Sequence, residues 1–508
     1  MHIDARTLPN GTVLEGDLCI VGAGAAGITI AREWIGARQT VLLLEGGGLQ
    51  YEAAMQDLYR GDIVGLPYFP LEAARLHLFG GTTGHWAGFC STFDGIDFAA
   101  RDWVPHSGWP LRREDLDPFY ARAQPLLELG PYDYRAAFWQ QQDPALVPLG
   151  LDPSAVWTKM WQFSPPTRFG TTYRDAIFAA PNVRLYTHAN VCTIEPNDAA
   201  SAVQGLRVRD FAGKELRVRA RHYVLACCSI QNARLLLVSN VGNAHDLVGR
   251  FFMEHLEIPS GRLALAPTAA PAGMKMYEWI PHVTKARGEL ALAPAVQREQ
   301  RVLNATVSLD PGAPDEVAQS TFQAVTPDVL AAQRDSEAAG SHEPSSPPVP
   351  SPPRSGRFFH VMTRQEQAPN PSSRVTLSSD RDALGMPRAR LDWQLTALDK
   401  QSFQRFYDVL GREFGRSGLG RVQVLDWVRT EDPAWPRTLS GGWHHMGTTR
   451  MHRDARSGVV DADCRVHGIA NLSIAGASVF PTAGAVNPTL TLVALSLRLS
   501  DHLKRRLA

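Results

Sequence analysis

Three glycines near the N-terminus have the spacing of a dinucleotide-binding turn. Gly22, Gly24 and Gly27 form G-x-G-x-x-G directly after the apolar run LCIV, where we expect a strand, and at the start of an expected helix. The first glycine allows a tight turn, the second lets the backbone approach a pyrophosphate, and the third lets helix and strand pack closely. Phosphate would lie at the helix N-terminus. The pattern therefore predicts a nucleotide-binding site.

A carboxylate further along supports this prediction. Glu45 closes the second expected strand, where an acidic side chain accepts hydrogen bonds from a ribose diol. The same charge would repel a 2′-phosphate, which argues against NADP. Residues 17–48 thus have the order strand, glycine turn, helix, strand of a βαβ unit. These residues do not decide between FAD and NAD.

Length and charge exclude several classes of protein. With 508 residues the chain is too long for one ordinary domain of about 100 to 200 residues, so we expect two domains. Its 51 basic and 51 acidic side chains cancel, which argues against nucleic acid as a partner because phosphate binding needs a basic excess or stripe. The sequence has no apolar run approaching the roughly 18 residues that cross a bilayer and no export signal at its start, so we expect a cytoplasmic protein without a transmembrane segment. Its six cysteines lack metal-like spacing, and we expect no metal site.

Strand patterns recur in two further parts of the chain. Within 182–240 the runs LRVRD, ELRVRA and YVLAC predict strands that return to the sheet of the nucleotide site. Within 267–435 the pattern changes to amphipathic strands such as FFHVM at 358–362, which predicts a mostly antiparallel sheet covering the first domain. The Pro- and Ser-rich stretch at 341–355 cannot bury enough apolar surface to order itself, so we expect a flexible insert there, either a surface loop or a mobile lid or docking segment near the active site.

Four segments together resemble the signatures of the glucose-methanol-choline (GMC) flavoprotein oxidoreductases. Besides the N-terminal glycine motif, the chain contains GGTTGHWAG at 80–88, VGRFFMEHL at 248–256 and, near its end, HHMGTTRM followed by NPTLT. They occur in the order that this family uses, and the resemblance spans the whole chain except the Pro/Ser-rich insert. It favours FAD over NAD as the cofactor.

The resemblance implies an α/β fold in which a discontinuous Rossmann-like FAD-binding domain is joined to an α+β substrate domain with a mostly antiparallel sheet. We assign residues 1–100, 176–260 and 436–508 to the FAD-binding domain. Residues 101–175 and 261–435 would form the substrate domain, with the flexible insert at about 331–356.

The resemblance also implies two catalytic residues. His444 matches the family's catalytic histidine, and Asn487 matches its second catalytic position. Oxidation of an alcohol removes the hydroxyl proton and a hydride from the same carbon, so a neutral imidazole must reach the hydroxyl while flavin N5 receives the hydride. We expect His444 to be this general base and Asn487 to orient the substrate oxygen. Pro488 suits the first turn of a helix whose N-terminus would stabilise the negative charge of the reduced flavin.

Several positions are expected to contact the cofactor, and His85 is the one with open alternatives. In some sugar-oxidising relatives a histidine just before the tryptophan of the GGTTGHWAG segment carries the flavin covalently, so His85 could be a covalent link, a noncovalent flavin contact or a structural residue. Gly476 stands where many relatives have aspartate and where pyranose and fructose oxidoreductases tend to have glycine. The full expected set is Gly22, Gly24, Gly27, Glu45, Thr82, Thr83, His85, Trp86, Val191, Gly476, Pro488 and Thr489.

The sequence therefore predicts an FAD-dependent enzyme that oxidises a secondary alcohol, a ring hydroxyl of a sugar or glycoside, to a ketone. Oxygen or a quinone-type acceptor would reoxidise the flavin, and the residues do not decide between oxidase and dehydrogenase. The alternatives are the same chemistry on a non-sugar alcohol, an FAD-containing lyase of the same fold that performs no redox reaction, and a noncatalytic flavin-binding subunit.

Overall fold

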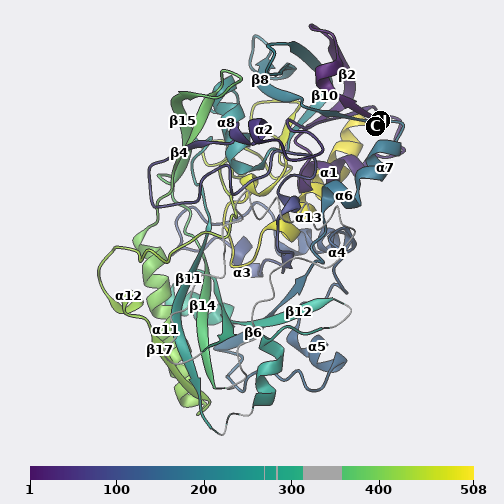
Figure 1. Ribbon diagram of the computed structural model, residues 1–508. Coiled ribbons are helices and arrows are strands. Elements are labelled where there is room, and N and C mark those ends of the chain that lie inside the picture. The colour runs from purple at the N-terminus through teal and green to yellow at the C-terminus, as the bar shows by residue number, and fades with distance from the viewer. Residues whose placement is uncertain (268, 270, 282–283, 313–356) are drawn as a thin grey trace.

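The computed structural model describes residues 1–267, 269, 271–281, 284–312 and 357–508 (Figure 1). The predicted Pro/Ser-rich insert at about 331–356 lies outside these residues. Among the described helices, none is both long and apolar enough to cross a membrane.

The first of two large sheets carries the predicted βαβ unit. The central strand β3 (Val41–Leu44) reads VLLL and is buried along its whole length, as expected for a strand covered on both faces. The strands β1, β7, β3, β2, β10 and β18 pair in parallel, whereas β9 and β8 extend the sheet as antiparallel strands. In order across the sheet they are β1 (His2–Asp4), β7 (Val183–Thr187), β3 (Val41–Leu44), β2 (Val13–Val21), β10 (Glu215–Leu225), β9 (Val203–Arg209) and β8 (Asn190–Pro196), with β18 (Leu472–Ile474) beside β10.

Helices from both ends of the chain cover this sheet. Helix α1 (Ala25–Glu33) follows β2 directly and packs against the C-terminal helix α13 (Thr489–Leu507), which buries a broad apolar face. Helix α8 (Cys228–Ser239) follows β10 in the same way. Figure 1 shows these elements gathered in the upper part of the molecule. The C-terminal part of the chain is therefore brought back against the N-terminal glycine turn.

The second sheet is antiparallel throughout and lies in the lower part of Figure 1, with the long helix α11 (Ala397–Arg416) beside its strand β17. Helix α11 begins at a capping box in which Thr396 and Asp399 exchange hydrogen bonds, and its buried aromatic residues face the sheet. Across the sheet the strands are β17 (Gly420–Val424), β11 (His255–Leu265), β14 (Phe358–Glu366), β13 (Ala305–Pro311), β12 (Lys285–Leu292), β6 (Val156–Phe163) and β5 (Phe89–Cys90).

A small third sheet and several short helices complete the described part of the fold. The sheet comprises β15 (Arg374–Arg381), β16 (Pro387–Asp392) and β4 (Gly61–Ile63). The remaining helices are α2 (Ala53–Asp57), α3 (Gly95–Phe98), α4 (Asp117–Leu126), α5 (Ala136–Gln142), α6 (Phe169–Thr172), α7 (Arg174–Ala179), α9 (Pro294–Gln300) and α12 (Asp426–Arg429), and the 3-10 turns are η1 (Ala5–Thr7), η2 (Gly81–Gly84), η3 (Arg113–Asp115), η4 (Pro271–Tyr277) and η5 (Ala477–Val479).

The predicted fold class is confirmed, since a largely parallel sheet with helices is joined to an antiparallel sheet. Strand β5 and the first residues of β11 fall in segments that we assigned to the FAD-binding domain, yet they pair within the second sheet. The exact domain boundaries stay a prediction.

Two of the motif glycines are fixed by close backbone contacts. Gly22 has φ +101°, and a Cβ at Gly27 would stand 1.9 Å from the Gly22 carbonyl oxygen. Helix α1 can therefore approach the turn after β2 only because residue 27 has no side chain.

We predict that Gly27→Ala destabilises the protein, because overpacking costs about 1–3 kcal/mol. Gly411→Ala in α11 is the matched control: a Cβ there meets no atom within 4 Å, so the substitution should be neutral or stabilise by up to about 1 kcal/mol. Thermal unfolding and flavin content of the purified variants check this. Equal melting temperatures and flavin contents for the two variants would contradict it.

Candidate active site

A cavity of about 1600 Å³ brings nearly all of the predicted site residues together. Ordinary small-molecule pockets measure about 300 to 1000 Å³, so this cavity can hold a large cofactor together with a substrate. Its walls come from the glycine turn, from η2, from the start of α13 and from strands of the second sheet. Of the predicted residues it is lined by Gly22, Gly24, Glu45, Thr82, Thr83, His85, Trp86, Val191, His444, Gly476, Asn487, Pro488 and Thr489. Gly27 is not among the lining residues.

One end of the cavity has the chemistry of a nucleotide site. Gly24 is the N-cap of α1, and the carbonyl of Ala23 accepts a hydrogen bond from the Gly80 N–H at 2.8 Å, which fixes η2 over the turn. The carboxylate of Glu45 is 5% exposed and accepts hydrogen bonds from the N–H groups of Ala23 (3.0 Å) and Gly47 (2.9 Å). A helix N-terminus and a held carboxylate in one cavity fit the pyrophosphate and ribose of FAD.

The GGTTGHWAG segment forms another wall of the cavity. Some of its polar groups are hydrogen-bonded within the protein, and others are not. The Thr83 hydroxyl donates to the Gly80 carbonyl (2.7 Å) and accepts from the Phe169 N–H (3.1 Å), and the Trp86 indole N–H donates to the Thr167 carbonyl (2.9 Å). These groups hold the segment in place, so Thr83 and Trp86 contribute mainly their shape to the cavity.

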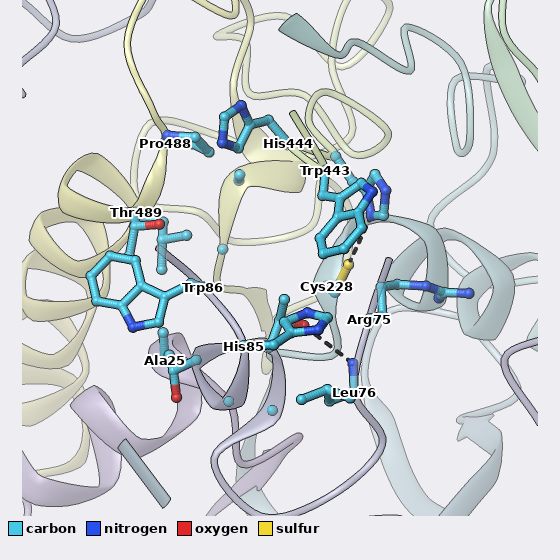
Figure 2. Close-up of a pocket in the computed structure, with 18 of the residues that line it drawn as sticks. Ala25, Arg75, Leu76, His85, Trp86, Cys228, Trp443, His444, Pro488 and Thr489 are labelled. Carbon is cyan, nitrogen blue, oxygen red and sulfur yellow. Dashed lines mark hydrogen bonds between the residues drawn. The ribbon is translucent and has the colours of Figure 1, made fainter. Parts of the chain in front are cut away.

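His85 differs from its neighbours because its ring has no polar partner. Both ring nitrogens are buried without a hydrogen bond among the described residues, and the ring lies 5.1 Å from that of Trp443 (Figure 2). Burial, with a smaller effect of the Arg168 charge, lowers the pKa of His85 to about 4. The ring is therefore a neutral imidazole that lines the cavity and is free to contact a bound group.

His444 and Asn487, which lie far apart in the sequence, meet in the cavity. Asn487 Nδ2 lies 3.1 Å from His444 Nε2, and Asn487 Oδ1 accepts a hydrogen bond from the Trp161 indole N–H at 3.3 Å. Asn487 precedes α13, and Figure 2 shows His444 close to Pro488 at the start of that helix. The two residues that we expect to be catalytic thus lie within hydrogen-bond distance of each other, and their roles stay a prediction.

The structure places His444 in a buried environment that keeps it neutral. Burial lowers its pKa well below the ordinary value, and the neighbouring His255, Arg364 and His445 add to this effect. The adjacent His445 points elsewhere, toward the Tyr68 hydroxyl, 2.9 Å from its Nε2. An imidazole without a proton on one nitrogen is what a general base requires.

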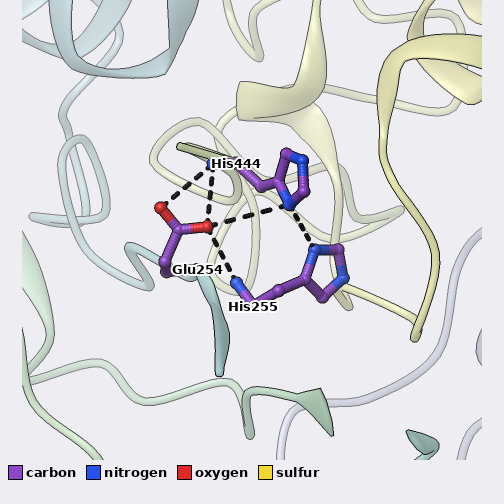
Figure 3. A group of neighbouring side chains, drawn as sticks. All are labelled: Glu254, His255 and His444. Atoms are coloured by element: carbon purple, nitrogen blue, oxygen red, sulfur yellow. Dashed lines mark hydrogen bonds and ion pairs between the residues drawn. The ribbon is translucent and has the colours of Figure 1, made fainter. Parts of the chain in front are cut away.

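Glu254 and His255, at the end of the VGRFFMEHL segment, are site residues that the sequence analysis did not identify (Figure 3). Glu254 is fully buried and accepts hydrogen bonds from the His444 N–H (2.8 and 3.0 Å), the His255 N–H (2.9 Å) and the Tyr68 hydroxyl. Burial raises the pKa of Glu254 to about 7. His255 Nδ1 lies 2.8 Å from His444 Nδ1. The available sequence signal was a pair of titratable residues inside the apolar run FFMEHLEI.

These three side chains also have ligand-type atoms within 4.8 Å of one another, as a metal site would need. Their short hydrogen bonds give these atoms other partners: the two Nδ1 atoms face each other at hydrogen-bond distance, and Glu254 accepts from two backbone N–H groups and from Tyr68. The geometry therefore fits a hydrogen-bonded cluster better than a cation site.

Two glycines before His444 make room for this cluster. A Cβ at Gly441 would lie 2.6 Å from Glu254 Cγ, and a Cβ at Gly442 would lie 2.5 Å from His444 Nδ1 and 2.7 Å from Glu257 Oε1. The first glycine of GGWHH is thus required by the packing of Glu254, and the second by the packing of His444 and Glu257.

The part of the cavity wall that belongs to the second sheet is strongly polar. Arg364 on β14 donates to Glu257 on the neighbouring β11 at 2.8 Å, and Arg287 donates to Glu289 on β12 at 2.6 Å. Arg364 Nη1 lies 3.7 Å from Glu289 and makes no direct hydrogen bond among the described residues. Trp161, Trp279, Phe89 and Phe163 add aromatic surface nearby.

A nucleotide-binding turn, a buried histidine beside Asn487 and a polar sheet wall around one cavity fit a flavin-dependent oxidoreductase. A family described as "FAD dependent oxidoreductase" matches residues 17–332, and one described as "GMC oxidoreductase" matches residues 369–496. The chain belongs to the FAD-dependent oxidoreductases, and the match of residues 369–496 to the GMC oxidoreductases confirms the resemblance seen in its motifs. It is an enzyme that uses FAD to oxidise alcohols.

Individual relatives differ in their named substrates. The chain is 25% identical to 2-methyl-1,2-propanediol dehydrogenase of Mycolicibacterium austroafricanum over 96% of this chain and 95% of that one. It is 37% identical to C-glycoside 3-oxidase of Microbacterium trichothecenolyticum, over 26% of this chain and 24% of that one. Its fold resembles the crystal structure of pyridoxine 4-oxidase from Mesorbium loti with a TM-score of 0.56 and 18% identity, covering 96% and 99% of the two chains.

We predict that Gly442→Ala slows flavin reduction by substrate without removing FAD. The new Cβ would displace His444, and a misplacement of about 1 Å can cost about 100-fold in rate. Gly150→Ala, where a Cβ meets nothing within 4 Å, is the control. Rapid-mixing measurement of flavin bleaching checks this, and equal rates in both variants would contradict it.

Proposed function

We propose that the enzyme oxidises a secondary ring hydroxyl of a sugar or glycoside to a ketone, with His444 as general base and Asn487 orienting the substrate oxygen. The observation that carries the proposal is the position of His444 and Asn487 in the same cavity as the polar wall of the second sheet. Bound FAD supplies the acceptor for the hydride, and oxygen or a quinone-type acceptor takes the electrons afterwards.

The geometry of the pair supports these roles. The Asn487 amide N–H faces His444 Nε2 at 3.1 Å. A substrate hydroxyl that displaces this hydrogen bond can give its proton to Nε2 while its oxygen accepts a hydrogen bond from the amide. Trp161 is a donor only, so its bond to Asn487 fixes which end of the amide faces the histidine. The base and the orienting donor are thus positioned before substrate arrives.

The polar wall favours a substrate with several hydroxyl groups. Its carboxylates and guanidinium groups are held in place by one another, so they offer fixed donors and acceptors without leaving a bare charge. Among the described residues, Arg364 Nη1 makes no direct hydrogen bond, so it is a donor that a substrate hydroxyl can use. A simple alkyl alcohol would make fewer hydrogen bonds to this wall than a sugar does, which lowers its binding energy. Similarity to a C-glycoside 3-oxidase agrees with this choice.

We predict that a sugar or glycoside reduces the flavin. The purified enzyme is mixed anaerobically with glucose, a methyl glucoside, an aryl C-glycoside and, as the non-sugar comparator, 2-methyl-1,2-propanediol. The second-order rate constant of flavin bleaching should be at least about 100-fold higher for one of the first three compounds than for the diol. A site with many hydrogen-bonding groups rejects compounds that have too few hydroxyl groups to pair with them. The reverse order would assign the enzyme to non-sugar alcohols, and no bleaching by any compound would favour a non-redox reaction.

We also propose that His85 carries the flavin covalently. The support is its buried, neutral ring with two unpaired nitrogens in the cofactor cavity. After acid precipitation we expect a yellow pellet from the wild type and a colourless pellet from His85→Ala. A colourless wild-type pellet under a yellow supernatant would contradict the covalent link.

A further inference from the structure

We propose that His255 is a positioning residue that fixes the tautomer of His444, leaving the nitrogen that faces Asn487 and the substrate without a proton. The proposal rests on the proposed role of His444 as base. It extends that role by naming the residue that determines which of the two ring nitrogens is basic.

The hydrogen bonds of His255 Nε2 define the tautomer of this ring. Its Nε2 lies 2.9 Å from the Gly484 carbonyl and 3.3 Å from the Ala483 carbonyl. Carbonyl oxygens only accept, so this nitrogen carries the proton. His255 is fully buried, and burial together with the Arg364 charge lowers its pKa to about 3, so the ring is neutral and its Nδ1 is an acceptor.

The partner of that acceptor is His444 Nδ1, 2.8 Å away. A hydrogen bond at this distance between two nitrogens needs one proton, and His255 Nδ1 has none, so His444 Nδ1–H is the donor. Because His444 is neutral as well, its Nε2 has a free lone pair.

The hydrogen bonds on the other side give the same assignment independently. Trp161 donates to Asn487 Oδ1, so the amide nitrogen is the end that faces His444 Nε2 at 3.1 Å. Two donors cannot face each other, and Nε2 is therefore the acceptor. The chain of bonds from the Gly484 carbonyl to the Trp161 indole is consistent only when His444 carries its proton on Nδ1.

Other charged and titratable groups around the pair are fixed and do not replace His255. Glu254 Oε1 is 4.0 Å from His444 Nδ1, beyond hydrogen-bond distance, and accepts from the backbone N–H groups of His444 and His255 instead, while Glu254 Oε2 accepts from Tyr68. Arg364 is paired with Glu257, and His445 is bonded to Tyr68. Among the described residues, the hydrogen-bond partner of His444 Nδ1 is therefore His255.

This arrangement has a consequence for the reaction. The substrate O–H bond would break and its proton would go to His444 Nε2, while bound FAD, the oxidant, would accept the hydride from the carbon that carries this oxygen. The imidazolium formed keeps its Nδ1–H bond to His255, and the Glu254 carboxyl at 4.0 Å faces the new charge. No proton has to move within the pair before the next turnover, since Nε2 alone gains and loses it.

Two substitutions separate the acceptor role from packing. In His255→Asn the amide oxygen can stand at the place of Nδ1 and still accept from His444. In His255→Gln the amide reaches the place of Nε2, which keeps the bond to the Gly484 carbonyl but removes the acceptor. The control is His222→Gln, a buried histidine of β10 that is bonded to Ser473 and lies outside the residues that line the cavity.

The limiting rate of anaerobic flavin reduction should fall about 100-fold in His255→Gln, since a wrong tautomer at a catalytic histidine costs up to about 10⁴-fold in kcat. The rate should stay within about tenfold of wild type in His255→Asn and be unchanged in His222→Gln, with apparent substrate Kd, FAD content and melting temperature retained in all three. An unchanged rate in His255→Gln, or an equal loss in the Gln and Asn variants, overturns the proposal.

A measurement on the unmodified holoenzyme covers the case in which a variant fails to fold. In protein with ring-¹⁵N histidine, NMR should show His444 protonated at Nδ1 and His255 protonated at Nε2, with the His444 signals assigned by their loss in His444→Gln. A proton on His444 Nε2 would overturn the proposal. This spectrum needs no substrate, so it stays informative even if no sugar bleaches the wild-type flavin and the proposed function fails.

Discussion

The hydrogen-bonded line that holds His444 between Asn487 and His255 is the constraint on which the rest of the site depends. His444 is hydrogen-bonded to Asn487, just before α13, and to His255, the first residue of β11. The base is therefore held by a helix that packs on the first sheet and by a strand of the second sheet. Its members are buried, which keeps the imidazoles neutral and makes each hydrogen bond costly to break. A shift of either element would misplace the base.

The two large sheets form the two ends of the cavity that contains His444. The parallel sheet ends at the glycine turn, where the N-terminus of α1 and the Glu45 carboxylate provide the nucleotide end of the cavity. The antiparallel sheet presents paired arginines and carboxylates at the other end. The two ends of the cavity are therefore lined by different sheets, and His444 lies in the same cavity as both.

The nucleotide end could be predicted from the sequence because its residues are close together in the chain. Gly22, Gly24, Gly27 and Glu45 belong to one βαβ unit, and short-range spacing determines their geometry. Asn487 and His444 were identified by resemblance to a family, and the structure brings them together. His255 could not be identified this way: it is 189 residues from His444, and only the pairing of distant elements shows that their rings meet. Arg364 could not be identified from the sequence either, because only the orientation of alternate residues along β14 places it on the cavity wall.

The most direct test of this account is the pH dependence of the limiting rate of anaerobic flavin reduction in the wild type and in His444→Ala. A buried histidine with a lowered pKa stays unprotonated, so the wild-type rate should not fall tenfold per pH unit until the pH drops through this lowered value, well below the ordinary histidine pKa of about 6.5. Glu254, whose pKa is about 7, can add only a step between two constant rates as it gains its proton. His444→Ala should bind FAD but be reduced several orders of magnitude more slowly. A wild-type rate that already falls tenfold per pH unit above about pH 6.5, or a His444→Ala rate equal to that of the wild type, would contradict the account.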